Sequence, residues 1–402
     1  MKLNASPNNE RLRSIFLELC RIPSPSGSEQ SVAAYIRTRL SAAGVSVTED
    51  GAGTALGGNC GNLYLRLEPS TEGSGEPLFL AAHMDTVPPD PQTGSPPGVE
   101  SDPQSGTGSS GVPGEVPVLI DGDRVHTNGQ SVLGGDDKLG IAAALELILS
   151  VTEDGNALPR SLDIAFTIQE ERGAKGAACF DAGLFKAVLG YVLDGEGPVG
   201  SAITKAPTKY RYTIEVRGRR SHAAVDPDSG RNAVAAAGEL ASRLPCGRPS
   251  QSSTANVGSI SGGGPSNIVP DTAQLVGEIR SFDSAEIETL QAQIQTLAAE
   301  VAARREVVVE VIWEHLYDAY NIEPDEPCLR MFADHCRSTG REPTLMSSLG
   351  GGDANALNAK GLRSIVYGLG MHNIHSRDEY ALFSELEAAT ELLFQIVLSP
   401  QF

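Results

Sequence analysis

The stretch PLFLAAHMDTV, residues 77–87, places a histidine and an aspartate where an apolar run ends. Alternate residues of a strand point to the same face, so the side chains of His83 and Asp85 can touch. A carboxylate that holds one imidazole nitrogen leaves the other nitrogen available, and metal-binding histidines are commonly held in this way. The pair could equally do no more than close the end of a strand. Taken alone, it slightly favours that structural role.

Further acidic and histidine residues stand at the ends of other expected elements, with Asp136 and Asp137 between a Gly-Gly turn and a helix and the others at or after strand-like segments. They are Asp136 and Asp137 in GGDDKLG, Glu170 and Glu171 in TIQEERG, Asp194 and Glu196 in VLDGEG, and His372, His375, Asp378 and Glu379 in MHNIHSRDEY. Ligands of open α/β sheets gather outside the carboxyl ends of the strands. Mixed imidazole and carboxylate ligands suit zinc, with manganese or cobalt as substitutes. Two metals bridged by one carboxylate are typical of hydrolases. The sequence therefore predicts a metal cluster with a spare carboxylate as general base.

The elements that must position these residues alternate in type. Apolar spacing indicates helices over 9–20, 29–43 and 137–151, and strands over 62–67, 77–83, 162–168 and 191–194. This alternation predicts an α/β domain whose mixed sheet is flanked by helices. Ser26 and Ser28 are the expected caps of the second helix, and Asp137 and Asp353 are the expected N-caps of theirs.

The pattern changes between residues 209 and 318. Alternating strands and two helices there predict a compact α+β module large enough to be a separate domain. We therefore expect an inserted domain over 209–318 and a catalytic domain formed by 1–208 and 319–402. A second interruption, residues 88–117, is dense in Pro, Gly, Ser and Asp, which predicts a surface excursion that borders the site.

The composition narrows the class of protein. The chain has 402 residues and a net charge of −20, which argues against nucleic-acid binding because phosphate contacts need a basic surface. No apolar run reaches the roughly 18 residues of a membrane helix. The first residues lack the apolar core of a signal peptide, and the six scattered cysteines are typical of reduced thiols. We expect a cytoplasmic protein with no nucleic-acid or membrane partner.

Seven motifs in order give the chain a family resemblance. They are AAHMDTV, GGDDKLG, QEERGAKGA, YVLDGEG, SHAAVDPDSGRNAV, GGGDANALNAKG and HNIHSRDEY, and they span nearly the whole sequence. Together they resemble the di-zinc exopeptidase family of peptidase T, which has aminoacylase and carboxypeptidase relatives. The long segment 88–117 departs from the basic family pattern.

The resemblance implies a role for each matching position. His83 and Asp194 would bind one zinc ion, Glu171 and His375 the other, Asp136 would bridge both, Glu170 would be the general base, and Asp85 would orient His83. The peptide bond after Asp136 is often cis in the family. A water molecule bridging two zinc ions would lose a proton to Glu170, and the resulting hydroxide would attack the scissile carbonyl. Glu170 would then deliver that proton to the leaving amine. Cobalt or manganese are possible substitutes for zinc.

The inserted domain resembles the family's lid and dimerisation domain. His222 would reach the developing oxyanion, commonly in the active site of a partner subunit, which implies a homodimer. Asn267 and Arg280 would contact the carboxylate end of the substrate. Both could instead be structural, Asn267 as a turn residue and Arg280 in a salt bridge on a strand face.

The remaining histidines are weaker candidates. His126, His315 and His335 fall in segments away from the acidic residues, and His372 competes with His375. Glu196 is the fallback ligand should Asp194 point away. The motifs lie nearest the peptidase T branch, so the resemblance implies a tripeptide aminopeptidase acting on short peptides. An N-acyl amino acid amidohydrolase or a carboxypeptidase is the alternative, and a non-catalytic peptide-binding protein is a third.

Overall fold

The chain divides into two compact units. The computed structural model describes residues 6–69, 75–88, 116–155 and 158–400. Unit 1 comprises Met1–Lys205, Asn321–Ser347 and Gly352–Phe402, and unit 2 comprises Ala206–Tyr320 and Ser348–Gly351. The sequence places the boundaries close by, at 208/209 and 318/319, but does not predict that Ser348–Gly351 belongs to unit 2. Most of the predicted excursion over 88–117 lies outside the described residues.

Unit 1 is built on a sheet that has nine strands within the described residues. These are β1 (Thr48–Glu49), β2 (Leu63–Leu67), β3 (Leu78–His83), β6 (Leu162–Thr167), β7 (Leu189–Glu196), β8 (Ser201–Ala206), β15 (Tyr320–Asn321), β16 (Thr344–Ser347) and β17 (Arg363–Met371). Their order is β1-β2-β6-β3-β7-β17-β8-β15, and β16 pairs with β8. β6, β3, β7 and β17 run parallel, whereas β2 and β8 pair antiparallel to them. The predicted mixed sheet is confirmed.

The parallel strands bring the acidic and histidine residues singled out from the sequence to one edge of the sheet. β3 is a fully buried apolar run that ends at His83. β6 ends just before Glu170, β7 carries Asp194 near its end, and β17 ends just before the segment with His375. Since parallel strands share one direction, their carboxyl ends meet at the same edge of the sheet.

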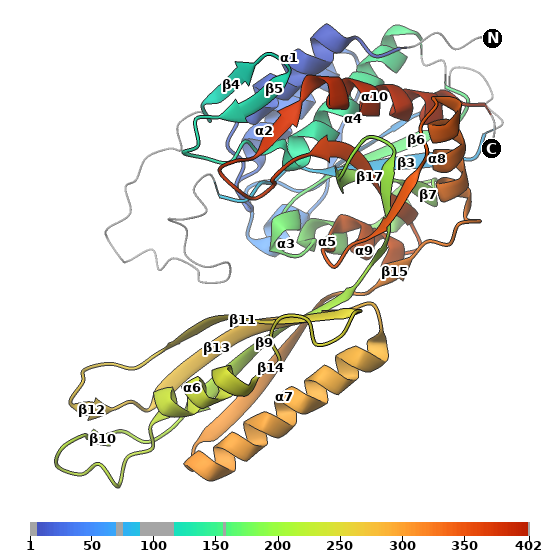
Figure 1. Cartoon of the computed structure of the whole chain (residues 1–402). Helices are drawn as coiled ribbons and strands as arrows, with labels where there is room; N and C mark the ends of the chain where they lie inside the picture. The colour runs from blue at the N-terminus through green and yellow to red at the C-terminus, as the bar shows by residue number, and fades with distance from the viewer. Residues whose placement is uncertain (1–5, 70–74, 89–115, 156–157, 401–402) are drawn as a thin grey trace. The chain divides into compact units, whose positions relative to one another are not determined.

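Helices cover both faces of this sheet. Those of unit 1 are α1 (Asn9–Cys20), α2 (Gln30–Ala42), α3 (Ala52–Leu56), α4 (Gly135–Glu153), α5 (Lys175–Cys179), α8 (Pro327–Ser338), α9 (Asp353–Ala359) and α10 (Phe383–Leu398). Figure 1 shows α1, α4 and α10 on one side of the sheet and α5 and α9 on the other. α4 is buried along almost its whole length, and Gly140 lets it approach β7. A Cβ at Gly140 would lie 2.1 Å from the carbonyl oxygen of Leu193.

Unit 1 also contains a second, smaller sheet. It consists of β4 (Val118–Asp121), β5 (Arg124–Thr127) and β18 (Tyr380–Leu382), in the order β18-β5-β4. Both pairings are antiparallel, so β4 and β5 form a hairpin that β18 extends. This pairing fixes the segment that follows His375 against the rest of the unit.

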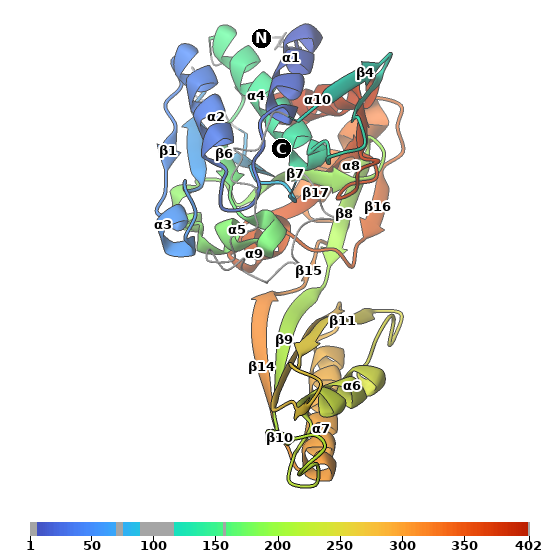
Figure 2. The same cartoon turned by 90° about the vertical axis from the view of Figure 1, so that its left-hand side faces the viewer.

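Unit 2 is an α+β module. Its elements are β9 (Thr208–Arg217), β10 (Ser221–His222), α6 (Ala233–Arg243), β11 (Ser253–Gly262), β12 (Ile268–Val269), β13 (Thr272–Ser281), α7 (Ser284–Arg305) and β14 (Val308–Tyr317). The antiparallel sheet has the order β11-β13-β9-β14, and α6 and α7 lie together on one of its faces (Figure 2). Leu275, Ile214 and Ile294 belong to the core between these layers. Within the described ranges, none of the helices combines the length and the apolar character that a membrane span requires.

Candidate metal centre

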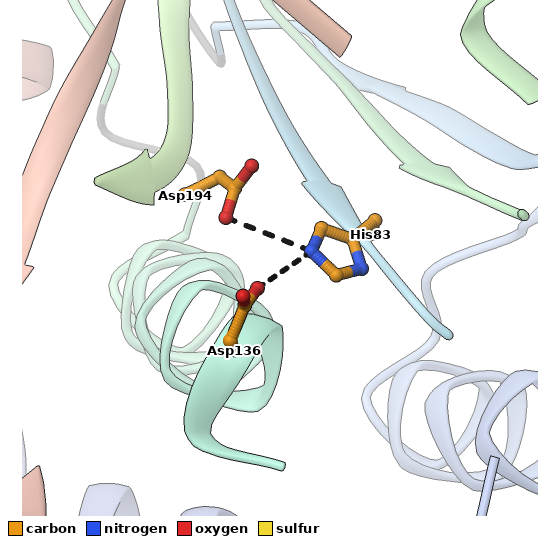
Figure 3. Close-up of side chains that lie close together, drawn as sticks. All are labelled: His83, Asp136 and Asp194. Atoms are coloured by element: carbon orange, nitrogen blue, oxygen red, sulfur yellow. Dashed lines mark hydrogen bonds and ion pairs between the residues drawn. The ribbon is translucent and has the colours of Figure 1, made fainter. Parts of the chain in front are cut away.

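Three side chains from three elements meet at the carboxyl edge of the sheet. His83 ends β3, Asp136 stands at the start of α4, and Asp194 lies on β7. The Nε2 atom of His83 is 2.8 Å from Asp136 Oδ1 and 3.6 Å from Asp194 Oδ1. Figure 3 shows both carboxylates turned toward this one nitrogen. The three ligand atoms lie close enough together to hold one metal ion.

A second group forms on the other side of Asp136. The Nε2 atom of His375 is 3.0 Å from Asp136 Oδ2 and 2.9 Å from Glu171 Oε1. These ligand atoms, too, all lie within 4.8 Å of one another. Each oxygen of Asp136 therefore faces a different histidine. A carboxylate so placed can bridge two metal ions.

The ring of His83 contacts Asp85, the residue that the sequence indicates, but its nearest partner there is the main-chain carbonyl and not the carboxylate. Its Nδ1 atom lies 2.8 Å from the carbonyl oxygen of Asp85, whereas the carboxylate of Asp85 is 3.5 Å away. A carbonyl oxygen only accepts, so in the neutral ring Nδ1 carries the hydrogen. The lone pair of Nε2 then faces Asp136 and Asp194, as a metal ligand requires.

The carboxylate of Asp85 holds a turn instead. Its Oδ1 accepts the amide of Glu170 at 2.8 Å, and its Oδ2 accepts the amide of Glu171 at 3.1 Å. The hydroxyl of Ser26 donates to the same Oδ2 at 2.6 Å. Residues 169–171, which we call the carboxylate turn, overlap the start of a short 3₁₀ helix, Glu170–Arg172. Asp85 thus positions the two glutamates through their main chain.

The cluster crowds several carboxylates together, and bound cations would neutralise their negative charge. Burial, with the nearby charge of Asp136 adding to its effect, raises the pKa of Asp194 to about 7. Burial also raises the pKa of Glu170, with Asp194 and Glu171 adding to the effect. Hydrogen bonds to Asp136 and Glu171 raise the pKa of His375 to about 11. Four crowded carboxylates and two imidazoles therefore fit two divalent metal ions in charge and in donor type.

Glu170 lies beside this cluster, close to His83 and Glu171. A glycine makes room for it: a Cβ at Gly352 would lie 2.5 Å from Glu170 Oε1. The sequence predicts Asp353 as the N-cap of α9, but Gly352 takes the cap position and Asp353 is buried. The hydroxyl of Thr167 donates to the Asp353 carboxylate, and burial raises the pKa of that carboxyl to about 6.

The start of α4 is fixed from two sides. Asp137 accepts the amide of Gly140 at 3.0 Å, as an N-cap does, and also the amide of His83 at 3.0 Å. The peptide bond between Asp136 and Asp137 is cis, as the family resemblance implies. Glu379 is buried and accepts the amides of Gly134 and Asp136.

Sequence reasoning missed the roles of Glu379 and Gly352. Both stand within the motifs quoted above, HNIHSRDEY and GGGDANALNAKG. Because each acts on the main chain or by the absence of a side chain, residue type alone did not point to it.

The weaker candidates lie elsewhere. His372 Nε2 is 2.6 Å from Glu385, and its ring stacks on Tyr380. Glu196 is exposed at the end of β7. The three remaining histidines have local partners: His126 with Asp121 on the hairpin, His315 with Asp318, and His335 with the carbonyl of Met331.

The three predicted lid residues all belong to unit 2. His222 is exposed on β10, which pairs with β12 next to Asn267. Its Nδ1 accepts the amides of Ala224 and Val225 at 3.2 Å each, so its Nε2–H is the donor. Arg280 donates to Glu278 at 2.8 Å and to the carbonyl of Leu349 at 2.9 Å.

These residues divide between the two ends of β13. Asn267 precedes the start of that strand at Thr272, and Arg280 stands near its other end. Eight residues along a strand separate those ends by roughly 26 Å. One copy of unit 2 therefore does not bring Arg280 together with His222 and Asn267.

Fold and site together define a metal-dependent hydrolase, and comparison with known proteins gives the family. The family described as peptidase family M20/M25/M40 matches residues 79–399. The chain belongs to this family and is a metallopeptidase.

Individual relatives place it near peptidase T. The chain is 30% identical to an uncharacterised protein, YqjE of Bacillus subtilis strain 168, over 97% of this chain and 98% of that one. It is 28% identical to peptidase T of Clostridium botulinum strain Loch Maree, over 68% and 67% of the two chains. The crystal structure of a tripeptidase from Staphylococcus aureus matches with a TM-score of 0.84 at 28% identity, covering 97% of this chain and 98% of that one. The expected resemblance to the peptidase T family is confirmed.

Proposed function

We propose that this protein is a two-metal tripeptide aminopeptidase. The observation that carries the proposal is the position of Asp136, whose two oxygens face two separate groups of imidazole and carboxylate ligands. His83 and Asp194 would hold one ion, and Glu171 and His375 the other. Similarity to a tripeptidase along almost the full chain supports the substrate class.

The chain's own residues supply the proton transfers. Two divalent metal ions, when bound, would lower the pKa of a water molecule and polarise the scissile carbonyl. Glu170 would accept the proton of the attacking water on its carboxylate and return it to the leaving amine. Asp85 fixes the main chain of Glu170, and Gly352 leaves its carboxylate unobstructed. Burial raises the pKa of Glu170 above its ordinary value, and a raised pKa favours proton uptake by the carboxylate.

We further propose that the enzyme works as a homodimer through unit 2. His222 offers an Nε2–H donor that suits a developing oxyanion. The span of β13 keeps Arg280 apart from His222 and Asn267, so two copies would have to contribute these residues to one substrate. In this arrangement Asn267 and Arg280 bind the carboxylate end of the peptide.

Zinc is the proposed metal, since imidazole and carboxylate ligands together suit it, and cobalt or manganese could replace it. The proposed compartment is the cytoplasm. All six cysteines are free thiols, which fits a reducing environment.

Comparison of kcat/KM on three substrates tests the substrate class. We expect a tripeptide with a free amino terminus to exceed both an amino-blocked tripeptide and an N-acetyl amino acid by about 100-fold or more. Preference for the N-acetyl amino acid would make the protein an amidohydrolase. Removal of the last residue of the blocked peptide would make it a carboxypeptidase. Peptide binding without cleavage, in zinc-loaded protein, would favour a binding protein.

A further inference from the structure

A second buried carboxylate supports the carboxylate turn. Glu29 has no exposed surface, although it lies outside the predicted site. Its Oε1 accepts the amide of Gly27 at 2.7 Å and the amide of Gln169 at 3.1 Å. With the two amides held by Asp85, three consecutive N–H groups of the turn, those of residues 169–171, bind two buried carboxylates.

Both the main-chain conformation of this turn and the burial of its carboxylates are unfavourable when taken alone. Gln169 has a φ of 51°, a left-handed conformation that is unfavourable for a residue other than glycine. Burial raises the pKa of Glu29, and the nearby charge of Asp85 raises it further. Two buried carboxylates side by side are costly unless hydrogen bonds offset the loss of solvent. The amides of the turn provide hydrogen bonds to Glu29 Oε1 and to both oxygens of Asp85, while Glu29 Oε2 has no hydrogen-bond partner among the described residues. Turn and carboxylates therefore hold each other in place.

The segment that carries Glu29 is tied to the end of β3. The amide of Thr86 donates to the carbonyl of Ser24 at 2.9 Å, and Ser26 donates to Asp85. Glu29 is the N-cap residue of α2, yet its side chain makes no cap hydrogen bond. The predicted capping role of Ser26 and Ser28 is therefore wrong. Glutamate is a poor N-cap residue, and its longer side chain is explained by its reach to Gln169.

We propose that Glu29 is a positioning residue for catalysis. By holding the amide of Gln169, it fixes the start of the carboxylate turn and so aims Glu170 and Glu171 together. It would act through the main chain and touch neither substrate nor metal. This inference rests on the proposed function for the roles of those two glutamates.

Three variants test it in the full-length protein. Glu29→Ala removes both hydrogen bonds, whereas Glu29→Gln keeps an oxygen that can accept both amides. Glu146→Ala is the matched control, because Glu146 is also fully buried but binds Arg11 and Ser150 away from the site. The measurements are kcat and KM on a free tripeptide, zinc affinity by competition with a chelator, and Tm.

Glu29→Ala should lower kcat by about 10- to 100-fold with little change in KM, and should weaken the binding of at least one zinc ion by a similar factor. Glu29→Gln should restore both to near the wild-type values. Glu146→Ala should lower Tm and leave kcat and zinc affinity unchanged. Normal kcat and zinc affinity in Glu29→Ala would overturn the proposal, as would loss of both in Glu146→Ala to the same degree.

Two provisions keep the outcome decisive. Should Glu29→Ala fail to fold, Glu29→Asp replaces it, because a side chain one methylene shorter keeps the charge but falls short of the Gln169 amide. Wild-type values in Glu29→Asp would then refute the positioning role. Should the wild-type protein cleave no peptide, the proposed function fails, and the zinc affinities alone decide whether Glu29 positions Glu171.

Discussion

Asp136 gives each of its two oxygens to a different imidazole, and this sharing explains much of the site. Had the two histidines met two separate carboxylates, two independent metal sites would be an equally good description. Instead His83 and His375, which are far apart in the sequence, converge on one side chain at 2.8 and 3.0 Å. A shared ligand would hold two ions, when bound, close enough together to act on one carbonyl.

Substitutions at two residues should separate chemistry from metal binding. Glu170→Gln removes the proposed base but leaves both ligand groups intact, so we expect kcat to fall by about 100-fold or more with metal content unchanged. His83→Ala removes an imidazole ligand, so the protein should lose at least one metal ion. Elemental analysis and kcat on a free tripeptide check both. Equal metal loss in the two variants would show that Glu170 is a ligand and not the base.

At the scale of the residue, the sequence indicates which residues meet better than it indicates which of their atoms are in contact. The spacing of His83 and Asp85 predicts that the two residues touch, and they do, although β3 ends at His83 and Asp85 lies beyond the strand. It does not tell which atom of Asp85 reaches the ring, because the main-chain carbonyl competes with the carboxylate. Asp353 gives a second example. A carboxylate after glycines is typical of an N-cap, whereas in the structure this carboxylate is buried and accepts a hydrogen bond from Thr167.

At the scale of elements, the contact between α4 and β7 sets the geometry of the site. α4 carries Asp136 and β7 carries Asp194, so the spacing of helix and strand fixes the distance between these two carboxylates. Gly140 permits the approach, because any Cβ there would meet the carbonyl of Leu193 and the carboxylate of Asp137.

Gly140→Ala should therefore damage both stability and metal binding. A methyl group at this position forces α4 away from β7, and such overpacking costs about 1–3 kcal/mol or more. Thermal unfolding and metal analysis of the purified variant measure the two effects. A variant with wild-type Tm and full metal content would show that helix and strand can separate without moving Asp136 from Asp194.

The elements were largely predictable, whereas their pairing was not. β3 is a short apolar run and α4 is a long one, and this difference in length indicates a strand and a helix. The placement of β17 beside β7 depends on contacts between residues about 170 positions apart, which no local pattern records. The support of the carboxylate turn by Glu29 escaped prediction for the same reason.

At the scale of the whole molecule, the metal-free protein should lose stability as the pH rises. Burial raises the pKa of Asp194 to about 7, and hydrogen bonds to Asp136 and Glu171 raise that of His375 to about 11. In the unfolded chain these groups titrate near 4 and 6.5, respectively. Both therefore bind protons more tightly when folded, and their favourable contribution, complete below the unfolded pKa, is lost as the pH rises through the folded pKa.

We expect the Tm of chelator-treated protein to fall by several degrees between about pH 5 and about pH 8. Metal-loaded protein is the control, because cations take the place of the protons, and its Tm should change less. A Tm that rises over this range in the metal-free protein would contradict the charge balance described for the site.

Mixing two inactive variants tests the proposed dimer. His222→Ala and Glu170→Gln each remove one of the two side chains that an active site needs. In a mixed dimer, one of the two sites would combine the intact Glu170 of one subunit with the intact His222 of the other. Random exchange of subunits should recover up to about a quarter of the wild-type kcat. No recovery, although subunit exchange is demonstrated by mass, would place His222 in its own subunit's site, and an active His222→Ala variant before mixing would place it outside catalysis.

The number of metal ions per chain, measured by elemental analysis of the zinc-loaded protein, tests the two-metal site most directly. With Asp136 as a bridge, about two zinc ions per chain are expected, and chelation that removes them should abolish tripeptide hydrolysis until zinc is returned. A protein that retains no metal after zinc is supplied, or that cleaves the peptide equally well after the metal is removed, would contradict the two-metal site.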